Sequence, residues 1–76
     1  MNMAKGMGAP EERLRKWVED MGYSITDAAK QIGIPRSMLS YFTNGKRRPG
    51  RRSANKIEHA TKAWKDGPIR SVDWDE

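Results

Sequence analysis

The sequence predicts an all-α fold, a small bundle of four to five helices with a short irregular or strand-like C-terminal tail. Apolar residues recur every three or four positions in four successive stretches, the period of an amphipathic helix. Glycine or asparagine–glycine follows the first three stretches, where a helix ends most readily. The 76 residues suffice for one domain with a thin core, and they contain no cysteine for disulfides.

The first predicted helix begins at Pro10 and ends before Gly22. Proline suits the first helical position because the N–H that it lacks would have no partner there. The apolar stripe of this helix consists of Leu14, Trp17, Val18 and Met21. A second, short helix follows Ser24, whose side chain is a good N-cap, and ends at Gly33. Residues 1–9 lack periodicity, and we expect a flexible N-terminal arm there.

The third predicted helix runs from about Arg36 to Thr43, because Pro35 confines the residue before it to extended geometry. Its apolar side holds Leu39 and Phe42. Its opposite side carries four residues that a core does not require: Arg36, Ser37, Ser40 and Tyr41. A fourth helix is predicted from about Ser53 to Trp64.

These elements divide the chain into the arm (1–9), a folded domain (10–66) and a C-terminal tail (67–76). The tail pattern fits either a strand or a short helical turn. Trp74 has no obvious place in so small a core, so it either packs back onto the domain or closes a dimer. If the tail forms a dimer contact, we expect Val72 and Trp74 in it.

Charge is distributed unevenly along the chain, whose net charge is +5. From Ala28 to Ile57 there is no Asp or Glu, but there are eight Lys and Arg residues. We call residues 28–57 the basic block. Such a one-sided block favours a polyanionic partner, with nucleic acid as the leading candidate. A solvated basic surface or attraction to acidic lipid would give the same pattern.

Several other classes of protein are not supported. No apolar run exceeds two residues, so neither a membrane span nor a secretory signal is predicted. The single histidine, His59, is expected on the outer side of the fourth helix. The acidic residues of the tail have neither a calcium-loop pattern nor the arrangement of an acid–base pair. We therefore expect no catalytic residue, metal, cofactor or small-molecule substrate.

The second and third predicted helices have the features of a helix-turn-helix. A small residue is needed where the two helices cross, and Ala29 occupies that position. Gly33 can adopt the positive φ that the turn requires. The apolar underside of the pair is formed by Ile32, Ile34, Leu39 and Phe42.

The stretch from Ile25 to Asn44 resembles the Cro and lambda-repressor-like family of phage and bacterial regulators. The resemblance covers roughly residues 13–74 and includes Met21-Gly22-Tyr23-Ser24, Asn44-Gly45-Lys46 and Ile69-Arg70-Ser71-Val72-Asp73. It implies a lambda-repressor-like bundle that binds a double-stranded, pseudo-palindromic DNA operator as a homodimer. The implied function is transcription regulation, with repression as the expected mode. The implied location is the cytoplasm of a bacterial or phage-infected cell.

The resemblance also implies a role for each matching residue. The base-reading positions correspond to Arg36, Ser37, Ser40 and Tyr41. The phosphate-binding positions correspond to Ser24, Asn44, Lys46, Arg47, Arg48, Arg51 and Arg52. Arginine can bind guanine through two hydrogen bonds, whereas phosphate contacts give affinity without sequence preference. The first residue of the second helix, often glutamine in this family, is Ile25 here, and we assign it no DNA contact.

Two alternative functions remain. An antitoxin-type protein would bind DNA and also a partner protein, but it would need a longer partner-binding segment than this tail. A general nucleic-acid binder, RNA included, would expose stacking aromatics in a strand or loop, and only Tyr41 is available. A DNA-binding repressor is therefore the leading hypothesis.

Overall fold

The computed structural model describes residues 9–74, so the expected N-terminal arm lies almost entirely outside the described residues. The described part contains four α-helices and one short 3-10 helix: α1 (Pro10–Met21), α2 (Ile25–Ile32), α3 (Arg36–Thr43), α4 (Arg51–Ala60) and η1 (Ser71–Trp74). The all-α prediction is confirmed, and the tail forms a helical turn rather than a strand. None of these helices has both the length and the hydrophobicity that a membrane span needs.

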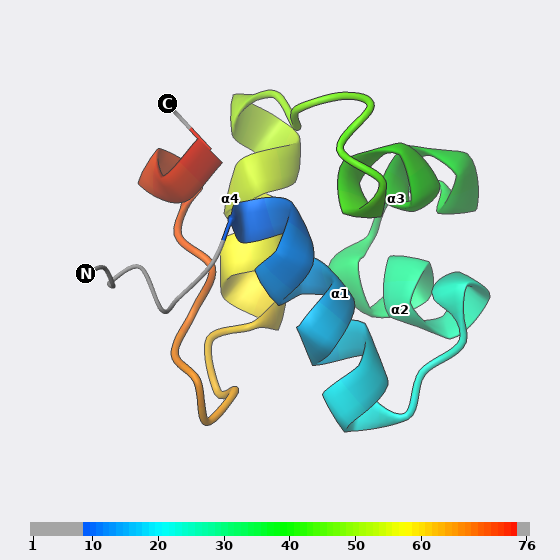
Figure 1. Ribbon diagram of the computed structural model, residues 1–76, viewed down its shortest axis with the longest axis vertical. Coiled ribbons are helices and arrows are strands. Elements are labelled where there is room, and N and C mark those ends of the chain that lie inside the picture. The colour runs from blue at the N-terminus through cyan, green and yellow to red at the C-terminus, as the bar shows by residue number, and fades with distance from the viewer. Residues whose placement is uncertain (1–8, 75–76) are drawn as a thin grey trace.

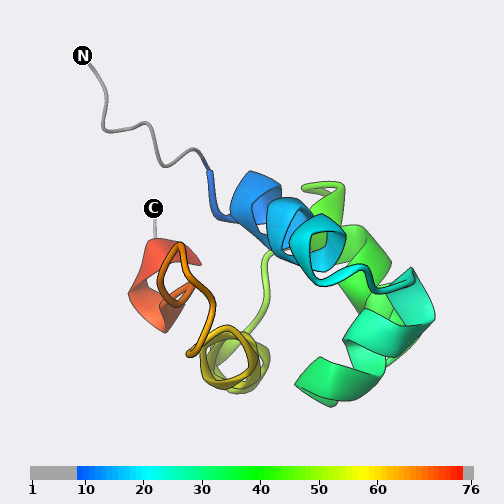
Figure 2. The same ribbon diagram turned by 90° about the horizontal axis from the view of Figure 1, so that it is seen from below.

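The helix-turn-helix pair occupies one end of the molecule. In Figure 1, α2 and α3 lie on one side of α1 and α4, and η1 lies on the other. The view from below shows α4 between η1 and α2 (Figure 2). Besides contacting each other, α3 packs against α1 and α2 packs against α4, and these two contacts join the motif to the bundle. The bundle therefore supports α3 from behind and leaves its outer side free.

Local sequence signals set the ends of α1 and α2. Gly22 and Gly33 follow the two helices with φ values of 71° and 92°, the left-handed region that glycine adopts without strain. The Ser24 hydroxyl accepts a hydrogen bond from the Asp27 amide at 3.0 Å, as expected of an N-cap. The turn is also tied to α4, because the Lys56 ammonium donates to the Gly33 carbonyl at 3.2 Å.

The hydrophobic core takes one face of each helix and part of the tail. Its buried members are Leu14, Trp17, Val18, Ala28, Ala29, Ile32, Leu39, Phe42, Ala54, Ile57, Trp64, Ile69 and Trp74. Met21, predicted in the apolar stripe of the first helix, is 47% exposed instead. It is the last residue of α1, and Gly22 turns the chain away directly after it.

The predicted bounds of the fourth helix were wrong at both ends. The helix begins two residues early because Gly50 takes the extended N-cap conformation, with φ −71° and ψ 178°. It ends at Ala60, and the next turn is tightened by a bond from the Trp64 amide to the Thr61 carbonyl, three residues back. The buried Thr61 hydroxyl donates to the Ile57 carbonyl at 2.8 Å and accepts from the Ile69 amide at 2.9 Å.

The tail is docked onto the domain by polar contacts as well as by apolar burial. The Glu58 carboxylate accepts a hydrogen bond from the Ser71 amide at 3.0 Å, which joins α4 to η1. The Asp73 carboxylate is 3.4 Å from the Arg13 guanidinium, which joins η1 to α1. The Trp74 side chain is only 5% exposed. Trp74 therefore packs back onto the domain, one of the two alternatives left open by the sequence.

Candidate nucleic-acid interface

The outer side of α3 is polar because its apolar residues all face the core. Leu39, Phe42 and Thr43 are buried, and they leave a strip of four residues that faces outward. Three of the four predicted base-reading residues are exposed and Ser40 is half-buried; the set is Arg36, Ser37, Ser40 and Tyr41. Spacings of four residues place Arg36 with Ser40, and Ser37 with Tyr41, on neighbouring turns.

A contact with α1 holds the C-terminal end of α3 in place. The Arg15 guanidinium of α1 donates to the Thr43 carbonyl at 2.8 Å and so satisfies a carbonyl in the last turn of α3. A cation there also interacts favourably with the negative end of the helix dipole. The sequence contains no indication of this role for Arg15, because its partner Thr43 lies 28 positions further along the chain. Ala29, the small residue expected where α2 meets α3, is buried in the core with 3% exposure.

The cationic side chains of the basic block are exposed and lack acidic partners within residues 9–74. All eight of its cationic side chains belong to exposed residues: Lys30, Arg36, Lys46, Arg47, Arg48, Arg51, Arg52 and Lys56. The ion pairs within residues 9–74 involve Arg13 and Lys16 of α1 and none of these eight. A surface whose positive charge is not neutralised attracts polyanions over a Debye length of about 8–10 Å.

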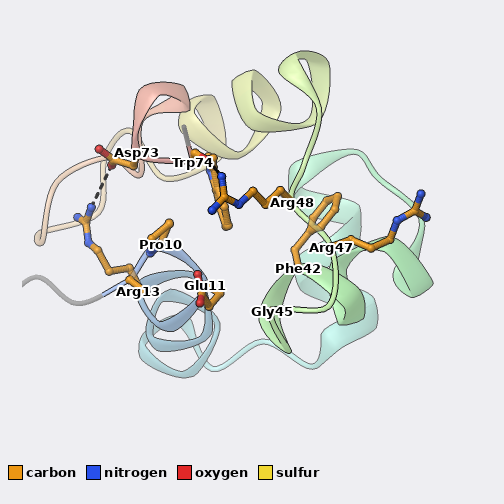
Figure 3. A pocket seen from close by; sticks show the side chains of 10 residues that line it. Pro10, Glu11, Arg13, Phe42, Gly45, Arg47, Arg48, Asp73 and Trp74 are labelled. Carbon is orange, nitrogen blue, oxygen red and sulfur yellow. Dashed lines mark hydrogen bonds and ion pairs between the residues drawn. The ribbon is translucent and has the colours of Figure 1, made fainter. Parts of the chain in front are cut away.

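The loop after α3 sends two adjacent arginines in opposite directions. The Lys46 amide donates to the Tyr41 carbonyl at 3.0 Å, so the loop starts against the last turn of α3. The Arg47 guanidinium lies over the Tyr41 ring, 5.8 Å from its centroid. The Arg48 guanidinium instead donates to the Trp74 carbonyl at 3.1 Å. Figure 3 shows the two side chains pointing away from each other.

The remaining predicted phosphate-binding residues lie at exposed helix ends. Ser24 caps α2, and its hydroxyl still has a proton to donate while it accepts from Asp27. Asn44 follows α3 as its C-cap. Arg51 and Arg52 open α4, whose first turn has no side-chain cap. Backbone amides at such a helix start can bind an anion together with these arginines.

A cavity of about 530 Å³ separates the loop from the tail. Pro10, Phe42 and Trp74 supply apolar wall, while Arg13 and Asp73 form an ion pair at one side (Figure 3). Walls of mixed charge do not select a ligand of either sign. Within residues 9–74, no three His, Asp or Glu side chains are grouped as a metal ion would require.

Comparison with known proteins identifies the same region. The helix-turn-helix family model matches residues 14–62, from the first buried leucine of α1 to just beyond α4. No curated protein and no solved structure matches the chain. The matched range contains the outer face of α3 and the whole basic block, whereas the tail lies outside it.

Proposed function

Because the chain belongs to the helix-turn-helix family of Cro-type and lambda-repressor-like proteins, and is thus a DNA-binding transcription regulator, we propose that it is a homodimeric repressor of a pseudo-palindromic operator. Its family is one of DNA-binding regulators and not typically of enzymes. It acts in the cytoplasm of a bacterial or phage-infected cell. The main support is the polar outer face of α3 beside eight cations that have no carboxylate partner in residues 9–74.

In this proposal α3 enters the major groove, which is wide enough for one helix. Arg36, at the start of α3, binds guanine through two parallel N–H donors. Ser37 and Ser40 donate to or accept from neighbouring base edges. Phosphates are held by residues that surround the helix: Ser24, Asn44, Lys46, Arg47, Arg51 and Arg52. Each cation that neutralises a phosphate releases a counterion, so binding weakens as salt rises.

Arg48 differs from the other proposed phosphate-binding residues. In the free chain its guanidinium donates to the Trp74 carbonyl. It can hold a phosphate either by exchanging this bond or by donating through its other N–H groups. Arg48 is therefore a less suitable probe of phosphate binding than Lys46, which has no side-chain partner in residues 9–74.

We propose a homodimer because the outer face of a single α3 is too small to recognise a whole operator. One recognition helix spans only a few base pairs, and two-fold dimers bind half-sites about 34 Å apart. We place the dimer contact at Val72, which is 56% exposed and borders a groove formed with Gly50 and Asn55 at the start of α4. Trp74, which is buried two residues further on, contributes by holding this turn against α4.

The test of DNA reading begins with an operator selected from random DNA, and then compares Arg36→Ala with Lys46→Ala. Arg36→Ala should weaken operator binding by about 1–3 kcal/mol and scrambled DNA much less. Lys46→Ala should weaken both alike and reduce the salt slope by about one per subunit. Titrations at several salt concentrations measure both quantities. An equal loss on both DNAs for Arg36→Ala would show that α3 is not the reader.

The dimer contact has a matched pair of variants. Val72→Gln and Met21→Gln each replace an exposed apolar side chain by the same polar one, at two different places. Val72→Gln should shift the protein toward monomers in sedimentation and lower its operator affinity, whereas Met21→Gln should leave both unchanged. A parent protein that sediments as a monomer and binds one half-site alone would refute the homodimer.

A further inference from the structure

The pairing of Arg47 with Tyr41 places a loop arginine beside the outer face of α3. The guanidinium carbon is 5.8 Å from the ring centroid, within the range of a cation–π contact. Both residues are exposed, and Tyr41 is 41% exposed although it neighbours the core residue Phe42. An exposed cation–π pair beside a polar helix face has no role in the core.

We infer that Tyr41 and Arg47 form one base-reading unit, in which the ring positions the guanidinium and the guanidinium binds a guanine. This inference rests on the proposed function and deepens it. It moves Arg47 from the phosphate-binding set to the base-reading set. It also makes Tyr41 a positioning residue whose ring, rather than its hydroxyl, matters for sequence preference.

A cation–π contact suits this role. The ring attracts the guanidinium through its charge and uses none of its N–H groups in a conventional hydrogen bond, so those donors stay free. Two of them match the O6 and N7 acceptors that guanine presents in the major groove. A ring beneath the arginine also restricts a side chain that would otherwise lose much rotamer entropy on binding.

The backbone of the loop directs Arg47 toward the reading face. The bond from the Lys46 amide to the Tyr41 carbonyl holds the loop against the end of α3, directly before Arg47. Ser37 and Tyr41 are one turn apart on α3. Because Arg47 lies against Tyr41, it extends this row of side chains beyond the end of the helix. Arg48, the next residue, leaves in the opposite direction toward Trp74 (Figure 3). Only one of the two adjacent arginines is therefore placed to reach bases beside α3.

The experiment measures binding of the full chain to a library in which each operator base pair is changed singly. Arg47→Ala should abolish the preference at one base pair of each half-site, a loss of about 5- to 150-fold on the operator, with little change on scrambled DNA. Tyr41→Leu should reduce the preference at the same base pair. The double variant should lose no more there than Arg47→Ala alone.

Two conservative variants separate the roles of the two side chains. Tyr41→Phe keeps the ring and should keep the preference at that base pair. Arg47→Lys keeps the charge but not the planar fork, and should lose the preference. If Tyr41→Phe loses the preference, the hydroxyl reads the base and the ring is not a platform. If Arg47→Ala weakens operator and scrambled DNA equally with a smaller salt slope, Arg47 binds phosphate and the inference fails.

Arg36→Ala is the control that keeps this failure distinct from failure of the proposed function. A sequence-selective loss for Arg36→Ala combined with a uniform loss for Arg47→Ala would preserve α3 as the reader and remove only Arg47 from the reading set. Uniform losses for both variants would overturn the proposed function as well. Circular dichroism melts identify any variant whose fold has changed.

Discussion

Replacing Thr61 by valine should weaken the docking of the C-terminal tail while leaving the shape of the core unchanged. Thr61 is completely buried, and its hydroxyl is the acceptor for the Ile69 amide at 2.9 Å. Valine has nearly the same shape as threonine but carries no oxygen. The tail then keeps its apolar contacts and loses the one polar contact at its buried start.

The magnitude follows from counting which groups lose a partner. The Ile57 carbonyl still accepts from the backbone amide of residue 61 at 3.0 Å, so losing the hydroxyl does not leave this carbonyl without a partner. The Ile69 amide, at a position with no exposed surface, has no replacement among the described contacts. A buried donor left without a partner costs about 1–3 kcal/mol. A domain of this size has a total stability of roughly 4–11 kcal/mol, so the loss is large.

Two measurements check the prediction, with Thr61→Ser as the matched control. Thermal melts should show a Tm lower by about 4–8 °C for each kcal/mol lost. Serine keeps the hydroxyl and removes one buried methyl group, a loss of about 1 kcal/mol, so melts alone do not separate the two variants. Amide hydrogen exchange at Ile69 separates them, because protection should fall in Thr61→Val and persist in Thr61→Ser. Unchanged Ile69 protection in Thr61→Val would refute the docking role of the hydroxyl.

Two further predictions concern the helix-turn-helix motif. Ala29→Leu should destabilise the protein by about 1–3 kcal/mol and lower its operator affinity, because Ala29 is only 3% exposed and a larger side chain would overpack the core. A variant that melts and binds DNA like the parent would show that α2 and α3 do not cross at this residue. Gly33→Ala should cost about 1–2 kcal/mol in urea unfolding from backbone strain alone, since φ is +92° and no atom lies within 4 Å of the added Cβ. A larger loss would point to a clash that the structure does not contain.

The elements that the sequence predicted well are those fixed by neighbouring residues. Glycines with positive φ end α1 and α2, and the Ser24 cap acts on an amide three residues away. The bounds of α4 escaped prediction because they depend on more distant or ambiguous features. Gly50, in the loop between α3 and α4, has a residue type that fits a turn as well as an N-cap, so the sequence did not show where α4 begins. The chain after Ala60 is held by the bond between Thr61 and Ile69, eight residues apart.

The same distinction applies to the candidate interface. Helical periodicity was sufficient to predict that the polar residues of α3 would face outward, and Arg36, Ser37 and Tyr41 are exposed. Periodicity gives no information about a loop, and the family resemblance assigned one role to both Arg47 and Arg48, although their side chains diverge. The position of Trp74 was undecided for a related reason. Its burial depends on the three-dimensional packing of η1 against α4, which no local pattern encodes.

The burial of all three tryptophans determines what intrinsic fluorescence can report. Trp17 packs edge-on against Tyr23, Trp64 donates to the Asp20 carboxylate at 3.1 Å, and Trp74 closes the tail. None of the three belongs to α3 or to the loop after it. Indole emission is therefore sensitive to the packing of the core and the docking of the tail. If DNA changes that emission, the chain has rearranged behind α3; constant emission indicates that the domain docks as a rigid body.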